Sequence, residues 1–389
     1  MKSRCPACDQ SEEFFCLYSA TQIPTQSCLL VASQREAQST PRADLCLVSC
    51  SHCGFIFNQL FDTATTHYRP GYEDQQRFSS TFNQFSAQLV KQLGNTYSLS
   101  DKTIVEVGCG KGDFLVELCT AVGAAGVGID PAWQEDRTAV ETGHNVRFVR
   151  DSLKRENIPA NPALILCRHT LEHIEYPLAF MRTVRECIKD NTPVFLEVPD
   201  ATRILESGSF EDIYYEHCNY FTAAALERLL ENSGFTVRES YRVYDDQYLC
   251  IEAIARPENT ARPAENAALT ANEQDSIARF KPAVSTNIQH WSANLATWSE
   301  RQESVAIWGS GSKCVAFLSA LPIAQVHAIV DINPYRSGLF APGTSLPIST
   351  PDALTTLRPD RIVLMNALYR QEVAQMLLDL GVATHISVL

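Results

Sequence analysis

Four cysteines near the start of the chain form two close pairs of a kind that often holds a metal ion. Cys5 and Cys8 are separated by two residues, and so are Cys50 and Cys53. Each pair can present two thiolates from one tight turn, and four thiolates form the tetrahedral ligand set of structural Zn²⁺. The two pairs lie 41 residues apart, so they can share an ion only if the fold brings them together. The alternatives are reduced surface thiols or a redox pair, although the strand-to-helix setting of thioredoxin-like redox sites is missing.

A glycine-rich segment after the apolar run 103–107 indicates a cofactor site. Glu106, Gly108, Gly110 and Gly112 follow one another at every second position. Glycine lets backbone N–H groups approach a ligand closely where a helix begins. The spacing differs from the Gly-x-Gly-x-x-Gly of dinucleotide-binding domains. It is similar to motif I of class I S-adenosylmethionine methyltransferases, although glycines kept only for packing are the alternative.

Three further residues extend this prediction along the chain. Asp130 ends the next apolar run, and the resemblance places there the carboxylate that meets the ribose hydroxyls. Asp151 follows the run 146–149 and matches the acid that meets the adenine amino group. Arg168 follows the next apolar run, at the carboxyl edge where open α/β sheets bind ligands, and we assign it to the cofactor side as well.

The segment 213–221, IYYEHCNYF, carries three tyrosines, a glutamate, a histidine and a cysteine in nine positions. It follows a predicted strand, so we expect it at the same sheet edge. A tyrosine-rich core loop with one buried histidine is the alternative. His169 and His173 follow the preceding predicted strand. They are four residues apart, as in His-Glu-x-x-His metal sites, but the glutamate here stands directly before the second histidine, so we favour packing or capping roles over metal binding.

The composition limits the classes of protein. The chain has 389 residues, 45% hydrophobic residues and a net charge of −13. No apolar run is long enough to span a bilayer, and the N-terminus lacks the apolar core of a signal peptide, so we expect no membrane association. The acidic charge argues against nucleic acid as a partner. Fourteen cysteines without export indicate thiols or metal ligands in a cytoplasmic protein.

Hydrophobic periodicity divides the chain into four parts. Residues 1–65 hold seven of the cysteines and form a separate zinc-binding module. Residues 66–255 begin with a helix over 75–94 and continue as alternating apolar runs and helical periods, which predict a mostly parallel sheet ending in a hairpin. Residues 256–300 read as a linker and a long helix that Pro282 kinks or starts. Residues 301–389 return to strand and helix alternation, a second and smaller α/β domain.

The last domain contains a sequence that is similar to the dinucleotide-binding fingerprint. Gly309 and Gly311 are followed by Asp331, but Cys314 stands where a third glycine is expected, so NAD binding is the weaker interpretation. Lys313 and Asn333 are candidate contacts to a substrate, and solvated loop residues are the alternative.

The order of these features resembles the three-domain C-methyltransferase family over essentially the whole chain. The features are the cysteine pairs, the sequence EVGCGKG, TLEHI, the YYEH loop and a final α/β domain with VDINPYRSGLFAPGT. The resemblance implies a class I, Rossmann-like methyltransferase domain between an N-terminal zinc-binding module and a C-terminal Rossmann-like α/β domain. Its best-known members methylate carbon 3 of nucleotide-linked 4-keto-deoxysugars, so the implied acceptor is such a sugar or a similar small molecule. Residues 21–38 differ from the sugar enzymes, which leaves another acceptor open.

The resemblance also assigns catalytic residues. The family's Tyr-x-Glu-His element matches Tyr214, Glu216 and His217, and its other active-site histidine, 44 residues earlier, matches His173. An upstream tyrosine matches either Tyr68 or Tyr72. In the implied reaction His217 removes a proton next to a carbonyl, Glu216 assists it, and Tyr214 and His173 donate hydrogen bonds to the enolate oxygen. The alternatives are an O- or N-methyltransferase of another small molecule and, against the acidic charge, a zinc-knuckle RNA methyltransferase. The oligomeric state stays open.

Overall fold

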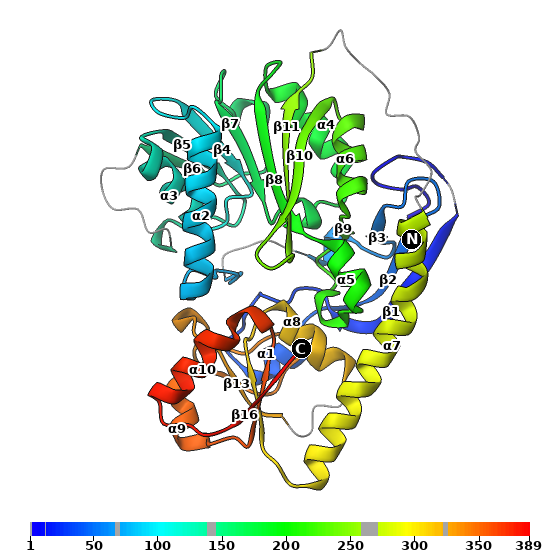
Figure 1. The fold of residues 1–389 in the computed structure, drawn as a ribbon, viewed down its shortest axis with the longest axis vertical. Coiled ribbons are helices and arrows are strands. Elements are labelled where there is room, and N and C mark those ends of the chain that lie inside the picture. The colour runs from blue at the N-terminus through cyan, green and yellow to red at the C-terminus, as the bar shows by residue number, and fades with distance from the viewer. Residues whose placement is uncertain (1, 12, 67–70, 138–144, 258–270, 322–325) are drawn as a thin grey trace.

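A computed structural model describes residues 2–11, 13–66, 71–137, 145–257, 271–321 and 326–389. The described strands form a four-stranded, a seven-stranded and a five-stranded sheet. Figure 1 shows the seven-stranded and five-stranded domains stacked along the long axis of the molecule, with helix α7 running along one side past the junction. No helix within these ranges is long and apolar enough to cross a membrane.

The seven-stranded sheet confirms the predicted mostly parallel α/β domain. Its strand order is β10-β11-β8-β7-β4-β5-β6, and β11 runs antiparallel to both of its neighbours. The strands are β4 (Thr103–Val107), β5 (Ala125–Ile129), β6 (Val146–Val149), β7 (Leu164–Arg168), β8 (Pro193–Pro199), β10 (Phe235–Val243) and β11 (Tyr248–Ala255). Strands β4, β5, β7 and β8 are parallel, so the segments that follow them meet at one edge of the sheet.

Amphipathic helices cover this sheet. They are α2 (Ser80–Thr96), α3 (Asp113–Val122), α4 (Pro177–Cys187) and α6 (Ala223–Asn232), whereas α5 (Ala201–Ser207) packs against α7 (Ala271–Glu300). Helix α2 differs from the predicted span 75–94. It begins later because the Ser79 hydroxyl accepts a hydrogen bond from the Phe82 N–H and caps the helix. It also continues past Gly94, which the sequence analysis took as its end.

The C-terminal domain is built on five parallel strands in the order β14-β13-β12-β15-β16. The strands are β12 (Val305–Trp308), β13 (Val326–Val330), β14 (Ile348–Ser349), β15 (Arg361–Leu364) and β16 (His385–Val388). The helices are α8 (Ser312–Ala320), α9 (Leu354–Leu357) and α10 (Arg370–Asp379). The long helix α7 (Ala271–Glu300) precedes them and contains Pro282 in its interior, so this proline does not mark its start.

The N-terminal segment contributes β1 (Phe14–Pro24), α1 (Gln34–Gln38), β2 (Arg42–Cys50) and β3 (Ile56–Asn58). The sheet β1-β2-β3 is completed by β9 (Asn219–Tyr220), which comes from the YYEH loop. One hydrophobic cluster joins this segment to α7 and the C-terminal sheet, and a second joins it to the seven-stranded sheet. The sequence analysis expected a separate module, but this segment shares its hydrophobic core with both neighbouring domains. So short a segment buries its apolar side chains against its neighbours instead of around a core of its own.

Candidate active site

A cavity of about 480 Å³ lies where the methyltransferase-like sheet edge faces the C-terminal domain. The glycine-rich loop after β4, the turn after β7 and the YYEH loop contribute to its wall, and so do loops after β12 and β13. Nine of the predicted site residues line it: Tyr72, Glu106, Gly108, Gly110, Gly112, Arg168, His173, Tyr214 and His217. Asp130, Asp151 and Glu216 do not line it, and Tyr68 lies outside the described residues.

The glycines of the loop have different surroundings. Gly108, Gly110 and Gly112 all have positive φ angles, which glycine adopts without strain. A Cβ atom on Gly108 would lie 2.0 Å from the Thr170 hydroxyl oxygen, and one on Gly112 would lie 2.3 Å from the Phe148 ring. A Cβ atom on Gly110 would meet nothing within 4 Å. Gly108 and Gly112 are thus required by packing, whereas Gly110 leaves open space at the cavity.

The acidic residues around this loop play unequal parts. Glu106 is 3% exposed, and its Oε2 atom has no hydrogen-bond partner among the described residues. Burial raises the pKa of Glu106 to about 8. A buried carboxyl group facing the open side of a glycine loop fits a polar, cationic cofactor such as S-adenosylmethionine. Asp130 accepts hydrogen bonds from the Gly110 and Ala132 N–H groups at 2.9 and 2.7 Å, so it holds the loop in shape.

Two of the other predicted cofactor residues are engaged elsewhere. Asp151 is partly exposed and pairs with Lys154 at 2.6 Å. Arg168 donates two hydrogen bonds to the buried Glu197 carboxylate, at 3.0 and 3.1 Å, and its guanidinium lies over the Phe114 ring. Burial would raise the pKa of Glu197, but Arg168 and His169 outweigh burial and hold it at about 2. In this structure Arg168 therefore braces β7 against β8 at the wall of the cavity.

Tyr214, His173 and His217 form another part of the cavity wall. The Tyr214 hydroxyl lies 2.9 Å from Nε2 of His217. The ring centroids of His173 and His217 are 4.7 Å apart. Burial, together with His173 and His169, lowers the pKa of His217 well below 6.5. Burial also raises the pKa of Tyr214 far above its ordinary value.

His173 has a fixed tautomer. Its Nδ1 atom lies 3.1 Å from the backbone carbonyl oxygen of Glu216. Burial lowers the pKa of His173 to about 4. A carbonyl oxygen can only accept, so Nδ1 of the neutral ring carries the proton and Nε2 carries a lone pair. This revises the role expected from the sequence, because such an Nε2 atom cannot donate a hydrogen bond to an enolate oxygen.

Glu216 is turned away from the cavity. It is fully buried, and its Oε1 atom accepts a hydrogen bond of 3.1 Å from the Ser27 N–H group. Its pKa is raised by burial to about 7, although hydrogen bonds from Ser27 and from the Tyr72 side chain oppose this shift. Tyr72 lines the cavity, so the carboxyl group positions Tyr72 at the site.

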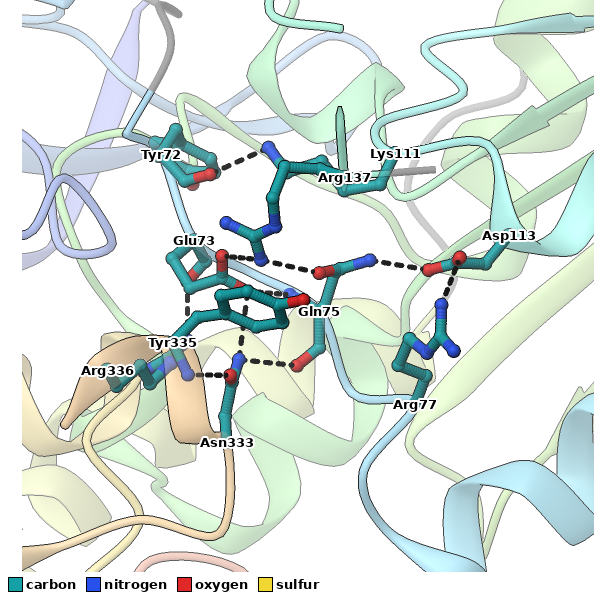
Figure 2. A network of polar contacts seen from close by, with 10 residues as sticks. All are labelled: Tyr72, Glu73, Gln75, Arg77, Lys111, Asp113, Arg137, Asn333, Tyr335 and Arg336. Atoms are coloured by element: carbon teal, nitrogen blue, oxygen red, sulfur yellow. Dashed lines mark hydrogen bonds and ion pairs between the residues drawn. The ribbon is translucent and has the colours of Figure 1, made fainter. Parts of the chain in front are cut away.

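The segment after Tyr72 joins the methyltransferase domain to the C-terminal domain (Figure 2). The Glu73 carboxylate accepts hydrogen bonds from Arg137 and Asn333, and Arg336 donates to its backbone carbonyl. Gln75 continues the network by accepting from Arg137 and donating to Asp113 at the start of α3. Because Asn333 and Arg336 belong to the C-terminal domain, this network fixes that domain against the glycine-rich loop.

The loop after β12, which carries the glycines similar to a dinucleotide fingerprint, also lines the cavity. Gly309, Gly311 and Lys313 are among its lining residues. The Lys313 amino group donates to the Asp212 carboxylate at 2.8 Å, and Asp331 accepts from the Ser310 N–H and hydroxyl groups. The loop therefore contributes to the same cavity as the YYEH segment instead of forming a second one among the described residues.

The cysteine pairs meet, as expected from the sequence. The four Sγ atoms of Cys5, Cys8, Cys50 and Cys53 all lie within 4.8 Å of one another, with Cys5 to Cys53 at 3.7 Å and Cys8 to Cys50 at 3.9 Å. A tetrahedral site with Zn–S bonds of about 2.3 Å has S···S separations of roughly 3.8 Å. The donor set and its dimensions fit Zn²⁺.

Sequence reasoning missed Glu172 among the titratable residues of the cavity. It is 2% exposed, lines the cavity, and has an Oε2 atom without a hydrogen-bond partner among the described residues. Burial raises its pKa to about 7. The signal was its place between His169 and His173 in TLEHI, directly after a predicted strand.

Comparison with known proteins agrees with this geometry. Residues 76–240 match a family model described as a methyltransferase domain, and residues 254–382 match one described as a C-methyltransferase C-terminal domain. The C-methyltransferase NovU of Streptomyces niveus is 24% identical over 340 residues, which cover 80% of this chain and 77% of that protein.

Two more distant similarities cover only part of the chain. A ubiquinone biosynthesis O-methyltransferase of Aliivibrio fischeri (strain MJ11) is 31% identical over 109 residues, which cover 26% of this chain and 46% of that protein. The magnesium protoporphyrin IX methyltransferase of Synechocystis PCC 6803 superposes with a TM-score of 0.36 at 16% identity, covering 48% of this chain and 91% of that protein.

The middle and C-terminal matches occur in the order found in the chain, and the similarity to NovU extends across both. The protein is an S-adenosylmethionine-dependent methyltransferase whose C-terminal region matches the C-terminal domain of C-methyltransferases.

Proposed function

We propose that this enzyme methylates a carbon atom next to a ketone in a small molecule, with a nucleotide-linked keto-sugar as the favoured acceptor. The observation that carries the proposal is that Tyr214 and His217 face the same cavity as the glycine-rich loop. One cavity can therefore hold the methyl donor and an acceptor beside acid–base groups. Methylation at carbon requires a base that removes a proton from that carbon, and the Tyr214–His217 pair can supply one.

The cofactor side is formed by the glycine-rich loop. Gly110 leaves open space, and Glu106 presents a carboxyl oxygen that has no hydrogen-bond partner within the described part of the chain, which suits the binding of S-adenosylmethionine. When bound, this cofactor supplies an electrophilic methyl group on a sulfonium sulfur. Asp130 keeps the loop in shape through Gly110. The roles of Asp151 and Arg168 at the cofactor remain predictions, because their side chains pair with Lys154 and Glu197.

The acceptor side carries out proton transfer. A saturated carbon has no lone pair, so a base must first remove the proton next to the carbonyl group. His217 is the proposed base. If its Nε2–H group donates to the Tyr214 oxygen, its Nδ1 atom takes the proton and the Tyr214 hydroxyl is left to donate to the enolate oxygen. Tyr72, whose hydroxyl donates to Glu216, is proposed to shape the wall of the acceptor site.

The C-terminal domain supports a nucleotide-linked acceptor. Lys313 and Arg203 both pair with Asp212, at 2.8 and 3.0 Å, and all three side chains line the cavity. Two cations beside one carboxylate can bind a diphosphate without large rearrangement. We also propose that the four cysteines bind a structural Zn²⁺, since four thiolate ligands leave no open position for substrate.

The experiment is a screen of nucleotide-linked keto-sugars with methyl-¹³C-labelled S-adenosylmethionine. The expected product carries the label on carbon, with a ¹³C shift typical of a C–CH₃ group and a coupling to the sugar carbon. A label on oxygen or nitrogen would replace the proposal with the O- or N-methyltransferase alternative, for which the partial similarity to the ubiquinone enzyme gives a reason. Enzyme-dependent exchange of the acceptor α-proton with deuterium, without cofactor, tests the enolate step separately.

A further inference from the structure

A second cluster of metal-ligating groups lies in the cavity, apart from the four cysteines. Glu172, His173 and His217 each offer one ligand atom, and the three atoms all lie within 4.8 Å of one another. All three side chains line the cavity. Two imidazoles and one carboxylate form a ligand set that Zn²⁺ and other first-row divalent metals accept.

The surroundings of His173 match those of a metal ligand. Its Nδ1 atom is hydrogen-bonded to the Glu216 carbonyl oxygen, which leaves the lone pair on Nε2. Histidine ligands usually donate their other ring N–H group to a backbone carbonyl or carboxylate in this way, because the bond orients the ring and strengthens the ligand. The contact thus supplies the outer hydrogen bond that such a site needs.

Glu172 gives a second and independent indication. It is 2% exposed, and its Oε2 atom has no hydrogen-bond partner among the described residues. A buried carboxyl oxygen without a partner is costly, and a cation removes that cost. Its backbone is held in place, because the Cys218 thiol donates to the Glu172 carbonyl oxygen and Asn219 donates to the carbonyl of Leu171.

The two imidazoles approach each other at an angle that suits one ion. Their planes are inclined by 76° with centroids 4.7 Å apart, so both rings can point to a common atom without overlapping. Ligand atoms around a zinc ion with bonds of about 2.0–2.1 Å stand roughly 3.4 Å apart, so modest side-chain rotations close the site. Three protein ligands leave a coordination position that faces the cavity.

We propose that Glu172, His173 and His217 form a second divalent-metal site, distinct from the cysteine site, and that Zn²⁺ bound there occupies the acceptor side of the cavity. A Zn²⁺ ion bound there coordinates the imidazole of His217, which the proposed reaction uses as its base, so excess Zn²⁺ inhibits the enzyme. The binding part of this inference rests on geometry alone and does not depend on the proposed acceptor.

The test is a calorimetric titration of the full-length protein, loaded beforehand with one equivalent of zinc, with further ZnCl₂. The wild-type protein is expected to bind one more equivalent. Glu172→Gln and His173→Ala are each expected to weaken that second equivalent by about tenfold or more. His290→Ala is the matched control, because His290 is exposed on α7 and does not line the cavity.

Cobalt distinguishes the second site from the cysteines. A second equivalent of Co²⁺ is expected to add visible d–d absorption without the near-ultraviolet thiolate-to-cobalt charge-transfer band that a cysteine site gives. Unchanged S-adenosylhomocysteine affinity and circular dichroism in both variants exclude misfolding, and His217→Ala, from the other loop, must lose the site as well. The inference is overturned if the wild-type protein binds one zinc only, or if the second equivalent persists in Glu172→Gln and His173→Ala.

Discussion

The hydroxyl oxygen of Tyr214 lies 2.9 Å from the Nε2 atom of His217, which follows it by three residues in the same loop. The bond holds the imidazole at the cavity wall and engages its Nε2 atom, so only Nδ1 is left for other partners. In the proposed tautomer, in which the Nε2–H group donates to the phenol oxygen, Nδ1 is the atom left for proton transfer. This one contact thus orients both His217, the proposed base, and Tyr214, the proposed donor to the enolate.

His217→Ala is expected to abolish methyl transfer to the accepted keto-sugar and to leave S-adenosylhomocysteine affinity nearly unchanged, because the imidazole is assigned to the acceptor and not to the cofactor. Tyr214→Phe should lower the rate of methyl transfer below that of the wild-type enzyme, because a general acid–base group contributes roughly 10²–10⁴-fold to the rate. Initial rates with labelled cofactor and calorimetry with S-adenosylhomocysteine measure the two effects. A His217→Ala enzyme that retains more than about a tenth of the rate would refute the assignment of the base.

The glycine-rich loop makes opposite predictions for two neighbouring positions. Gly108→Ala should lower the melting temperature clearly, because the new Cβ atom would lie 2.0 Å from the Thr170 hydroxyl. Gly110→Ala has free space around it and pays only the left-handed backbone strain of about 1–2 kcal/mol, but it intrudes on the cofactor side. It should therefore weaken S-adenosylhomocysteine binding more than it lowers stability. Equal melting temperatures for the two variants would contradict this reading of the loop.

Cys5→Ser is expected to remove the structural zinc and to destabilise more than the N-terminal segment. Cys5 and Cys50 are buried in a hydrophobic cluster shared with the seven-stranded sheet, so loss of the ion loosens that cluster too. Elemental analysis should fall from one structural zinc per chain to none, and the midpoint of chemical unfolding should fall with it. Cys16→Ser is the control, since this exposed cysteine lies outside the four-sulfur cluster and should keep the ion.

Glu106 should make the stability of the protein depend on pH. Burial raises its pKa from 4.5 to about 8 in the folded protein. Between these values the folded state binds the proton and the unfolded state does not, so the contribution of Glu106 to the free energy of unfolding falls as pH rises through this window. Glu106→Gln mimics the protonated form and should remove this dependence. Urea unfolding at pH 6 and pH 9 measures it, and a wild-type slope equal to that of the variant would exclude the effect.

Glu73 should be important for holding the C-terminal domain in place. Its carboxylate is 3–4% exposed and pairs with Arg137 and Asn333. Glu73→Ala leaves the Arg137 guanidinium without its carboxylate, which is expected to cost about 3 kcal/mol of the free energy of unfolding. Arg4→Ala, which breaks the exposed pair with Asp9, should cost less than about 1 kcal/mol. Similar losses in both variants would show that the Glu73 network is not a major source of stability.

Local patterns in the sequence determined much of the fold. Two residues between cysteines, glycines at alternate positions and apolar runs of strand length each specify a turn or element within a few residues. These patterns predicted both α/β domains, the terminal hairpin of the seven-stranded sheet and the meeting of the four cysteines. The sequence did not predict where α2 begins, because the hydroxyl of Ser79, not the apolar period, determines the first residue of that helix.

Only the tertiary structure decided which side chains face the cavity. Glu216 and His217 are neighbours in the sequence, yet the Glu216 carboxylate bonds to the backbone of Ser27, 189 residues earlier, and His217 lines the cavity. Glu172 enters the cavity, whereas Asp151 stays at the surface with Lys154. Residue spacing fixes local conformation, but the direction of a side chain in a loop depends on the distant segment that packs against it. The same reason explains why strand β9 joins the N-terminal sheet, a pairing that no local pattern specifies.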